Sequence, residues 1–122
     1  MSVAGFLFDE NMPHRAIRKL LRTKNADVQC WVIGEPGAPA IGSPDPELLI
    51  WIEENNCILV TRNHASMPVH LRDHLTLGRH VPGILVMKSR LASWQMAQEL
   101  LLIWGASLPG EYQDQIVVWP RK

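Results

Sequence analysis

Phe6-Leu7-Phe8-Asp9-Glu10-Asn11 begins as an unbroken apolar run and ends in two acids and an amide. Short apolar runs bounded by polar residues are typical of strands that are buried on both faces of a sheet. The apolar character starts at Ala4, so we predict a buried strand over residues 4–8, with Asp9 at its exposed end. Pro13 follows closely, and proline is a favoured first residue of a helix. This stretch therefore predicts a strand, a short turn and a helix.

Strand and helix signals continue to alternate along the rest of the chain. Apolar runs predict further strands over residues 28–33, 57–61, 83–87 and 115–119. Helical signals predict helices that begin at Pro13, near Ser43 or Asp45 (either of which could cap its helix), at Met67 and near Leu91. The stretch 34–46 holds three glycines and four prolines, so it is predicted to be a loop.

Apolar spacing also predicts which helix faces are buried and where the helices end. In the first helix, the expected buried residues are Ala16, Ile17, Leu20 and Leu21. In the last helix, the expected stripe is Leu91, Trp94, Ala97, Leu101 and Trp104. The expected ends of the second, third and last helices are Asn55-Asn56, Gly78 and Gly105.

The alternation of strands and helices predicts an α/β fold of three layers, in which helices cover both faces of a mostly parallel sheet of about five strands. No second domain or internal repeat is visible, so residues 1–122 are expected to form a single domain. The final strand is expected at an edge of the sheet. Ligands of such sheets bind beyond the carboxyl ends of the strands. These ends correspond to residues 9–11, the loop up to Asp45, residues 61–64 and residues 88–90.

The net charge of the chain is zero, although two of its segments are locally basic. The 122 residues include 12 basic and 12 acidic side chains, so the chain lacks the strong positive charge that is typical of nucleic-acid-binding domains. Two segments are locally basic, and each is either a solvated helix face or an electropositive patch. Their members are Arg15, Arg18, Lys19, Arg22 and Lys24 in the first segment, and His64, His70, Arg72, His74, Arg79 and His80 in the second.

The sequence also indicates where in the cell the protein is expected. The longest apolar runs are far too short to span a bilayer, and we expect no signal peptide and no membrane partner. Cys30 and Cys57 each lie in an apolar stretch, which favours buried free thiols over a structural disulfide. A cytoplasmic location is therefore expected.

The acids at the strand ends are the candidate ligands of a metal ion. Asp9 and Glu10 follow directly on a buried strand, where they contribute little to packing and are well placed to bind Mg²⁺ or Mn²⁺. Asp45 and Glu47 lie at the predicted start of the second helix. Acids are favoured there by the helix dipole, so capping is an alternative role for Asp45. Together with Asp9, Asp45 becomes a candidate second ligand.

Three segments resemble, in order and spacing, a family of small PIN-like domains of unknown function. The family pattern is a strand ending in Asp-Glu-Asn, a long loop, an aspartate at a helix start, and a strand ending in Thr-Arg-Asp. The matching segments here are residues 6–11, 43–49 and 58–63, and the later Pro82-Gly83-Ile84 also fits the pattern. The resemblance covers about the first three-quarters of the chain.

The resemblance implies a PIN-like fold and a metal-dependent ribonuclease. PIN domains gather acids that hold divalent metal and activate water for cleavage of RNA, and many are toxins restrained by an antitoxin protein. By position, the implied catalytic residues are Asp9, Asp45 and Asn63, with Glu47 as the substitute for Asp45. The implied ligands of Mg²⁺ or Mn²⁺ are Asp9, Glu10 and Asp45. The candidate RNA contacts are Arg15, Arg62 and Lys88, although Arg62 and Lys88 could equally pair with the acids. A homodimer is also considered, since small toxin-like domains often dimerise.

Asn63 departs from the family pattern, which has an acid there, and Ala65 stands where a further acid often occurs. An amide keeps an oxygen ligand but removes a full charge, so affinity for Mg²⁺ should fall and a two-metal site becomes hard to support. Two readings follow. Either one ion binds at Asp9, Glu10 and Asp45, or the protein is a catalytically impaired module that binds RNA or another protein.

The sequence offers two alternatives to this metal site. His70 and His74 are four residues apart on a predicted helix and share a face, as transition-metal ligands can, but a basic, solvent-facing surface is the favoured interpretation. A response-regulator receiver also has paired acids after its first strand. It needs a phospho-accepting aspartate after its third strand, where this chain has Thr61-Arg62-Asn63, so this reading is ranked low.

Overall fold

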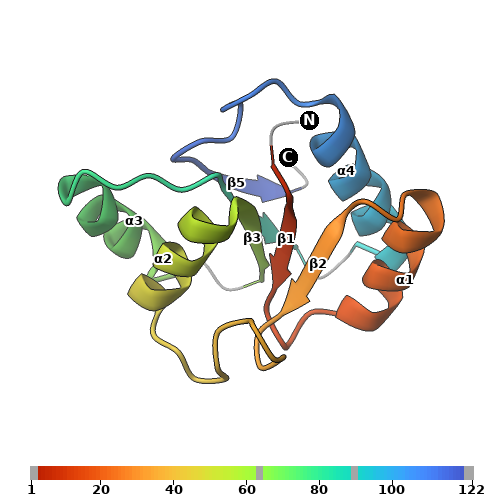
Figure 1. The fold of residues 1–122 in the computed structure, drawn as a ribbon, viewed down its shortest axis with the longest axis horizontal. Helices are drawn as coiled ribbons and strands as arrows, with labels where there is room; N and C mark the ends of the chain where they lie inside the picture. The colour runs from red at the N-terminus through yellow and green to blue at the C-terminus, as the bar shows by residue number, and fades with distance from the viewer. Residues whose placement is uncertain (1–2, 63–64, 89–90, 120–122) are drawn as a thin grey trace.

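The computed structural model describes residues 3–62, 65–88 and 91–119. Strands and helices alternate along the chain as predicted (Figure 1). The strands are β1 (Gly5–Phe8), β2 (Gln29–Val32), β3 (Cys57–Thr61), β4 (Ile84–Met87) and β5 (Ile116–Trp119). The helices are α1 (His14–Lys24), α2 (Asp45–Asn55), α3 (Met67–Thr76) and α4 (Ser93–Ala106).

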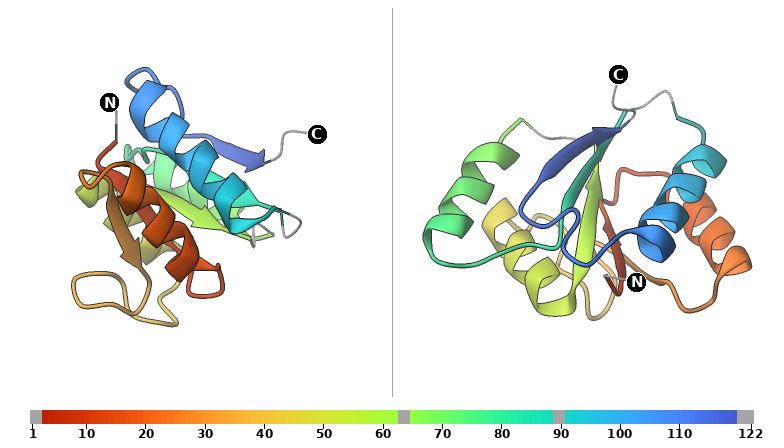
Figure 2. Two further views of the ribbon diagram at one scale, coloured as in Figure 1. Left: turned by 90° about the vertical axis from the view of Figure 1, so that its right-hand side faces the viewer. Right: turned by 90° about the horizontal axis from the view of Figure 1, so that it is seen from above.

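The five strands form one sheet in the order β2-β1-β3-β4-β5, and every neighbouring pair is parallel. Helices α1 and α4 cover one face of the sheet, and α2 and α3 cover the other (Figure 2). The predicted three-layer α/β class is therefore confirmed, with a sheet that is parallel throughout and consistent with a PIN-like fold. β5 lies at an edge, as expected.

The core consists of two apolar layers, one on each face of the sheet. Alternate residues of β1 point to opposite faces, so Phe6 and Phe8 pack with α1 and α4, whereas Leu7 packs with α2 and α3. All three side chains are fully buried. This two-sided burial is why the central strands are continuous apolar runs.

The first and last helices differ from the sequence prediction at two positions. Ala16 is exposed on α1, whereas Ile17 and Leu21 are buried. Trp94 is 61% exposed in the first turn of α4, and this helix packs a partly different stripe against the sheet. That stripe is Met96, Ala97, Leu100, Ile103 and Trp104.

The observed ends of α4 and α2 agree only in part with those that the sequence predicts. Gly105 does not end α4, which runs to Ala106, and the N–H of Ser107 then donates to the carbonyl of Ile103 at 3.4 Å. By contrast, Asn56 ends α2 in the left-handed conformation at φ 52°, as predicted. Neither Ser43 nor Asp45 caps α2; Pro44 occupies the N-cap position.

Cys30 and Cys57 are both buried and free, which confirms that interpretation. Burial raises the pKa of the Cys57 thiol to about 12. None of the helices that the structure describes has the length and apolar character needed to cross a bilayer.

Candidate functional site

The candidate site lies at the carboxyl edge of the sheet, between β1 and β3. The chain crosses from β1 to β2 on one side and continues with β3 on the other, so β1 and β3 flank the point where the strand order reverses. In open parallel sheets this switch point opens a crevice beyond the strand ends. Asp9 follows β1 there, and its N–H donates to the carbonyl of Val60 on β3 at 3.1 Å.

A cavity of about 60 Å³ opens at this point. Its polar lining comes from Asp9, Asp45 and Thr61, which belong to three separate segments of the chain. Its apolar walls are Ile33, Leu48, Leu59 and Met67. Because a water molecule in the liquid takes up about 30 Å³, the cavity has room for an ion with a very small number of waters.

The Asp9 carboxylate is oriented by hydrogen bonds from Thr61 and Asn11. Its Oδ2 accepts from the Thr61 hydroxyl at 3.1 Å, and its Oδ1 accepts from the N–H of Asn11 at 3.1 Å. Thr61 ends the neighbouring strand, so parallel pairing brings its hydroxyl beside Asp9. The two bonds orient the carboxylate at the cavity and leave further lone pairs for a ligand.

Asp45 is held at the start of α2 by the start of α3. Its Oδ2 accepts from the Ser66 hydroxyl at 2.8 Å and lies 3.8 Å from Nε2 of His70. Asp45 is the first residue of α2, where the helix dipole favours a carboxylate. Ser66 is a site residue that the sequence does not predict, since a lone serine before a helix carries no signal of this contact.

Glu10 is a neighbour of the cavity and is not one of its lining residues. A hydrogen bond with the Asp9 side chain, helped by partial burial and by the charge of Asp9, raises the pKa of Glu10. The raised pKa reflects the negative charge that the two carboxyl groups concentrate beside the cavity.

The residues present fit one divalent ion better than two. Mg²⁺ is commonly bound by one or two carboxylates, with water and substrate oxygens completing the shell, and Asp9 and Asp45 supply that number. Across residues 3–62, 65–88 and 91–119, no three His, Cys, Asp or Glu side chains come together as a ready metal site. Asn63 lies outside the described residues, and Glu47 is exposed and does not line the cavity.

The three candidate RNA contacts all follow the carboxyl ends of strands or begin a helix there. Arg62 comes directly after β3, Lys88 directly after β4, and Arg15 lies in the first turn of α1. All three are exposed, and none lines the cavity. The structure thus places positive charge on the same edge of the sheet as Asp9, outside the cavity itself.

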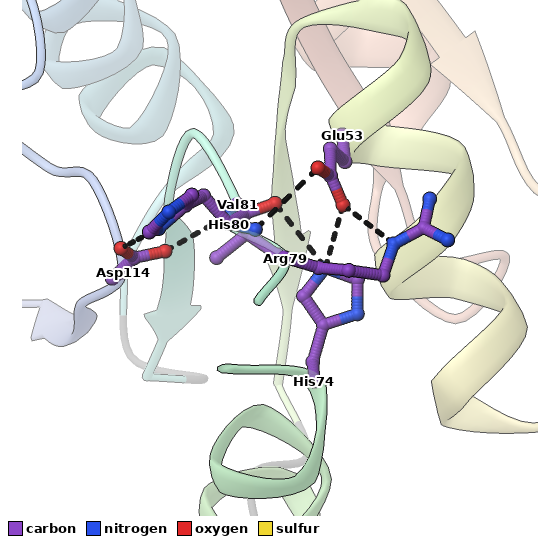
Figure 3. Close-up of polar contacts among 6 residues, drawn as sticks. All are labelled: Glu53, His74, Arg79, His80, Val81 and Asp114. Atoms are coloured by element: carbon purple, nitrogen blue, oxygen red, sulfur yellow. Dashed lines mark hydrogen bonds and ion pairs between the residues drawn. The ribbon is translucent and has the colours of Figure 1, made fainter. Parts of the chain in front are cut away.

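His70 and His74 do not form the basic, solvent-facing surface that their spacing favours. His70 lies near Asp45, whereas His74 is buried and its Nε2 lies 2.8 Å from Oε1 of Glu53 on α2 (Figure 3). The reason is that α3 packs against α2 along the face that carries both histidines, and α2 presents an acid to each. His80 is exposed and pairs with Asp114 at 2.7 Å, and His64 lies outside the described residues.

Comparison with known proteins adds no relative, since no protein-family model, no curated protein and no solved structure matches this chain. The fold and the site define its class as a three-layer α/β protein with an acidic cavity at the switch point of its sheet.

Proposed function

We propose that this protein is a metal-dependent ribonuclease of PIN type that acts at the cavity between β1 and β3. The observation that carries the proposal is the convergence of Asp9 and Asp45, from different elements, on one cavity at the carboxyl edge. Restraint by an antitoxin protein belongs to the proposal through the resemblance to PIN-like domains. So does a cytoplasmic location, because two buried free thiols suit a reducing compartment.

Each side chain has a defined task under this proposal. Asp9 and Asp45 hold one Mg²⁺ or Mn²⁺ ion, with Glu10 adding negative charge beside Asp9. The bound ion would lower the pKa of a water molecule and screen the scissile phosphate. Thr61 and Ser66 orient the two carboxylates through their hydroxyls. Arg15, Arg62 and Lys88 contact the phosphates of the RNA strand on either side.

The proposal predicts that Mn²⁺ raises the melting temperature of the natural protein and supports cleavage of single-stranded RNA. Asp9→Asn should abolish the thermal shift and lower the cleavage rate by at least about a hundredfold, because the amide removes the charge that holds the ion. Melting curves with and without Mn²⁺, together with cleavage of a fluorescent RNA, measure both effects.

Asp27→Asn is the matched control. Asp27 is exposed in the loop between α1 and β2, so the substitution makes the same chemical change away from the cavity. It should leave both the thermal shift and the cleavage rate unchanged. Cleavage that survives Asp9→Asn, or a natural protein that does not respond to Mn²⁺, would rule out this site as a metal-dependent nuclease.

A second candidate function is a catalytically impaired PIN-like module that binds RNA or a protein. It is favoured by the Asp45 carboxylate, which already accepts a hydrogen bond from Ser66 and lies near His70. It is also favoured by Asn63 in place of the third acid of the family pattern.

Asn63→Asp separates the two functions. If the site is impaired, the substitution should add Mn²⁺ affinity and start RNA cleavage that the natural protein lacks, since it restores a full negative charge. Isothermal titration with Mn²⁺ and the same cleavage assay measure the change. A natural protein that already cleaves as fast as the Asn63→Asp variant would exclude the impaired reading.

A further inference from the structure

The two edges of the sheet are protected differently. At the edge formed by β2, the side chains of Arg18 and Glu35 form an ion pair, with 2.8 Å between NH1 and Oε2. Glu35 Oε1 accepts from the N–H of Val32 at 2.9 Å, and Arg18 NH2 donates to the carbonyl of Cys30 at 3.2 Å. The ion pair therefore forms hydrogen bonds with the main chain of β2.

These bonds are made to the side of β2 that faces away from the sheet. The N–H of Gln29 donates to Ala4 and the N–H of Ile33 donates to Phe8, so the odd-numbered residues of β2 face β1. Cys30 and Val32 consequently face outward, where the ion pair takes the place of a neighbouring strand. The hydrogen bond from Arg18 also lowers the pKa of Glu35, which keeps the pair charged. The edge at β2 is closed to another strand.

In the described part of the chain, the opposite edge, at β5, has no ion pair that hydrogen-bonds to its outward-facing main chain. The carbonyls of Gln115 and Trp119 accept from Ile84 and Lys88, at 3.0 and 2.8 Å, so these residues face β4. The main-chain groups of Ile116 and Val118 therefore face away from the sheet. Among the described residues, no side chain bonds them as Arg18 and Glu35 bond β2. In the right-hand view of Figure 2, no helix or strand lies in front of β5.

An apolar groove of about 520 Å³ lies beside this edge, between α3 and β5. Its lining residues are Pro68, Leu71, Arg72, Leu75, Thr76 and Ile116. Leu77, which follows α3, is 77% exposed. The open strand edge is thus bordered by apolar surface, the combination that favours pairing with another chain.

We propose that a second copy of this chain pairs with β5 in antiparallel orientation, about a two-fold axis at Val117. In this register Ile116 of each copy lies opposite Val118 of the other, and the two Val117 residues lie opposite each other. The outward-facing groups of both residues in both copies then exchange four main-chain hydrogen bonds. The five-stranded sheets join into one sheet of ten strands.

The sequence of β5 is what favours a second copy over an unrelated strand. Its core Ile116-Val117-Val118 reads as three β-branched residues in either direction, so the two-fold register pairs β-branched side chains throughout. The strand has no charged residue, so the symmetry places no like charges opposite each other. A two-fold contact requires this self-complementarity. The inference does not depend on the proposed nuclease activity.

The first test is the mass of the natural chain in solution, measured by light scattering over a range of concentrations. A dimer is expected. Val118→Lys should weaken it by about tenfold or more, because each copy then sets a charged group against Ile116 of the other in a dry interface. Gln29→Lys should leave the dimer intact, because Gln29 is an exposed residue of β2, at the opposite edge of the sheet. Circular dichroism checks that both variants are folded.

The second test does not rely on weakening the protein. In the proposed register the two Val117 residues form a pair with Cα atoms about 4.5 Å apart, within the range for a disulfide. Val117→Cys should therefore form a covalent dimer on mild oxidation, whereas Val118→Cys should not, since its two Cα atoms are more than about 7 Å apart. A natural chain that remains monomeric at high concentration, or equal cross-linking of the two variants, would overturn the proposal.

Discussion

Gly5→Ala is expected to lower the free energy of unfolding by at least about 3 kcal/mol and to leave little folded protein. A Cβ at this position would lie 1.9 Å from the carbonyl oxygen of Gln29 and 2.6 Å from its carbonyl carbon. These are main-chain atoms of β2, so no side-chain rotation can relieve the contact. β1 and β2 would have to separate at the first pair of their register, Gly5 with Gln29.

Urea denaturation, followed by circular dichroism, measures this loss. Gly105→Ala is the control, since a Cβ there meets nothing within 4 Å and the residue lies inside α4. Alanine in a helix is better than glycine, so the control should gain about 0.5–1 kcal/mol. Equal midpoints for Gly5→Ala and the natural chain would show that β1 and β2 do not approach as closely as described.

Glu53→Ala is expected to cost about 2–3 kcal/mol, because it removes the acceptor shared by the buried His74, the half-buried Arg79 and the N–H of His80. Glu53 Oε1 lies 2.8 Å from Nε2 of His74 and accepts from Nε of Arg79 at 3.0 Å, and its Oε2 accepts from the N–H of His80 at 3.4 Å (Figure 3). The His74 side chain is only 4% exposed, so water does not easily replace the lost carboxylate.

The neighbouring Glu54 provides the control for this prediction. It is exposed on α2, and Glu54→Ala should change stability by less than about 0.5 kcal/mol. Urea denaturation of both variants at neutral pH makes the comparison. Similar losses for the two substitutions would mean that the contacts of Glu53 contribute nothing beyond an exposed helix surface.

The same carboxylate makes stability depend on pH. Burial alone would raise the pKa of Glu53, but hydrogen bonds from Arg79, the His80 N–H and His74 outweigh it and lower the pKa. A carboxyl whose pKa is lower in the folded state contributes stability above its unfolded pKa and loses it as the pH falls through its folded pKa. The natural chain should therefore lose stability in the acid range more steeply than Glu53→Ala, as denaturation across that range would reveal.

The contacts of Glu53 also connect helices and loops that the hydrogen bonds of the sheet do not join. They join α2 to α3 and to the segment before β4, and Asp114 continues the chain of contacts through His80 and the N–H of Val81 (Figure 3). This polar cluster lies at the amino edge of the sheet, opposite the cavity of Asp9. α2 and α3, whose first residues surround the cavity, are thus held together at their far ends.

The sequence by itself determined the elements of this protein and their order. The apolar run 6–8, the proline at position 13 and the paired asparagines 55–56 act through their own φ and ψ preferences and through nearest neighbours, so their effects are visible without the fold. The parallel sheet followed from the alternation, because parallel strands require crossover connections. Asp9 was located at a strand end for the same local reason.

Only the tertiary structure decided which of these elements meet. The placing of Asp45 beside Asp9 depends on the strand order and on the packing of α2, and the sequence carried no direct signal of either. The burial of His74 depends on Glu53 lying on the facing helix, and the exposure of Trp94 depends on which part of α4 packs against the sheet. These outcomes are set by contacts between residues distant in the chain, whose free energies outweigh the local preference of any one side chain.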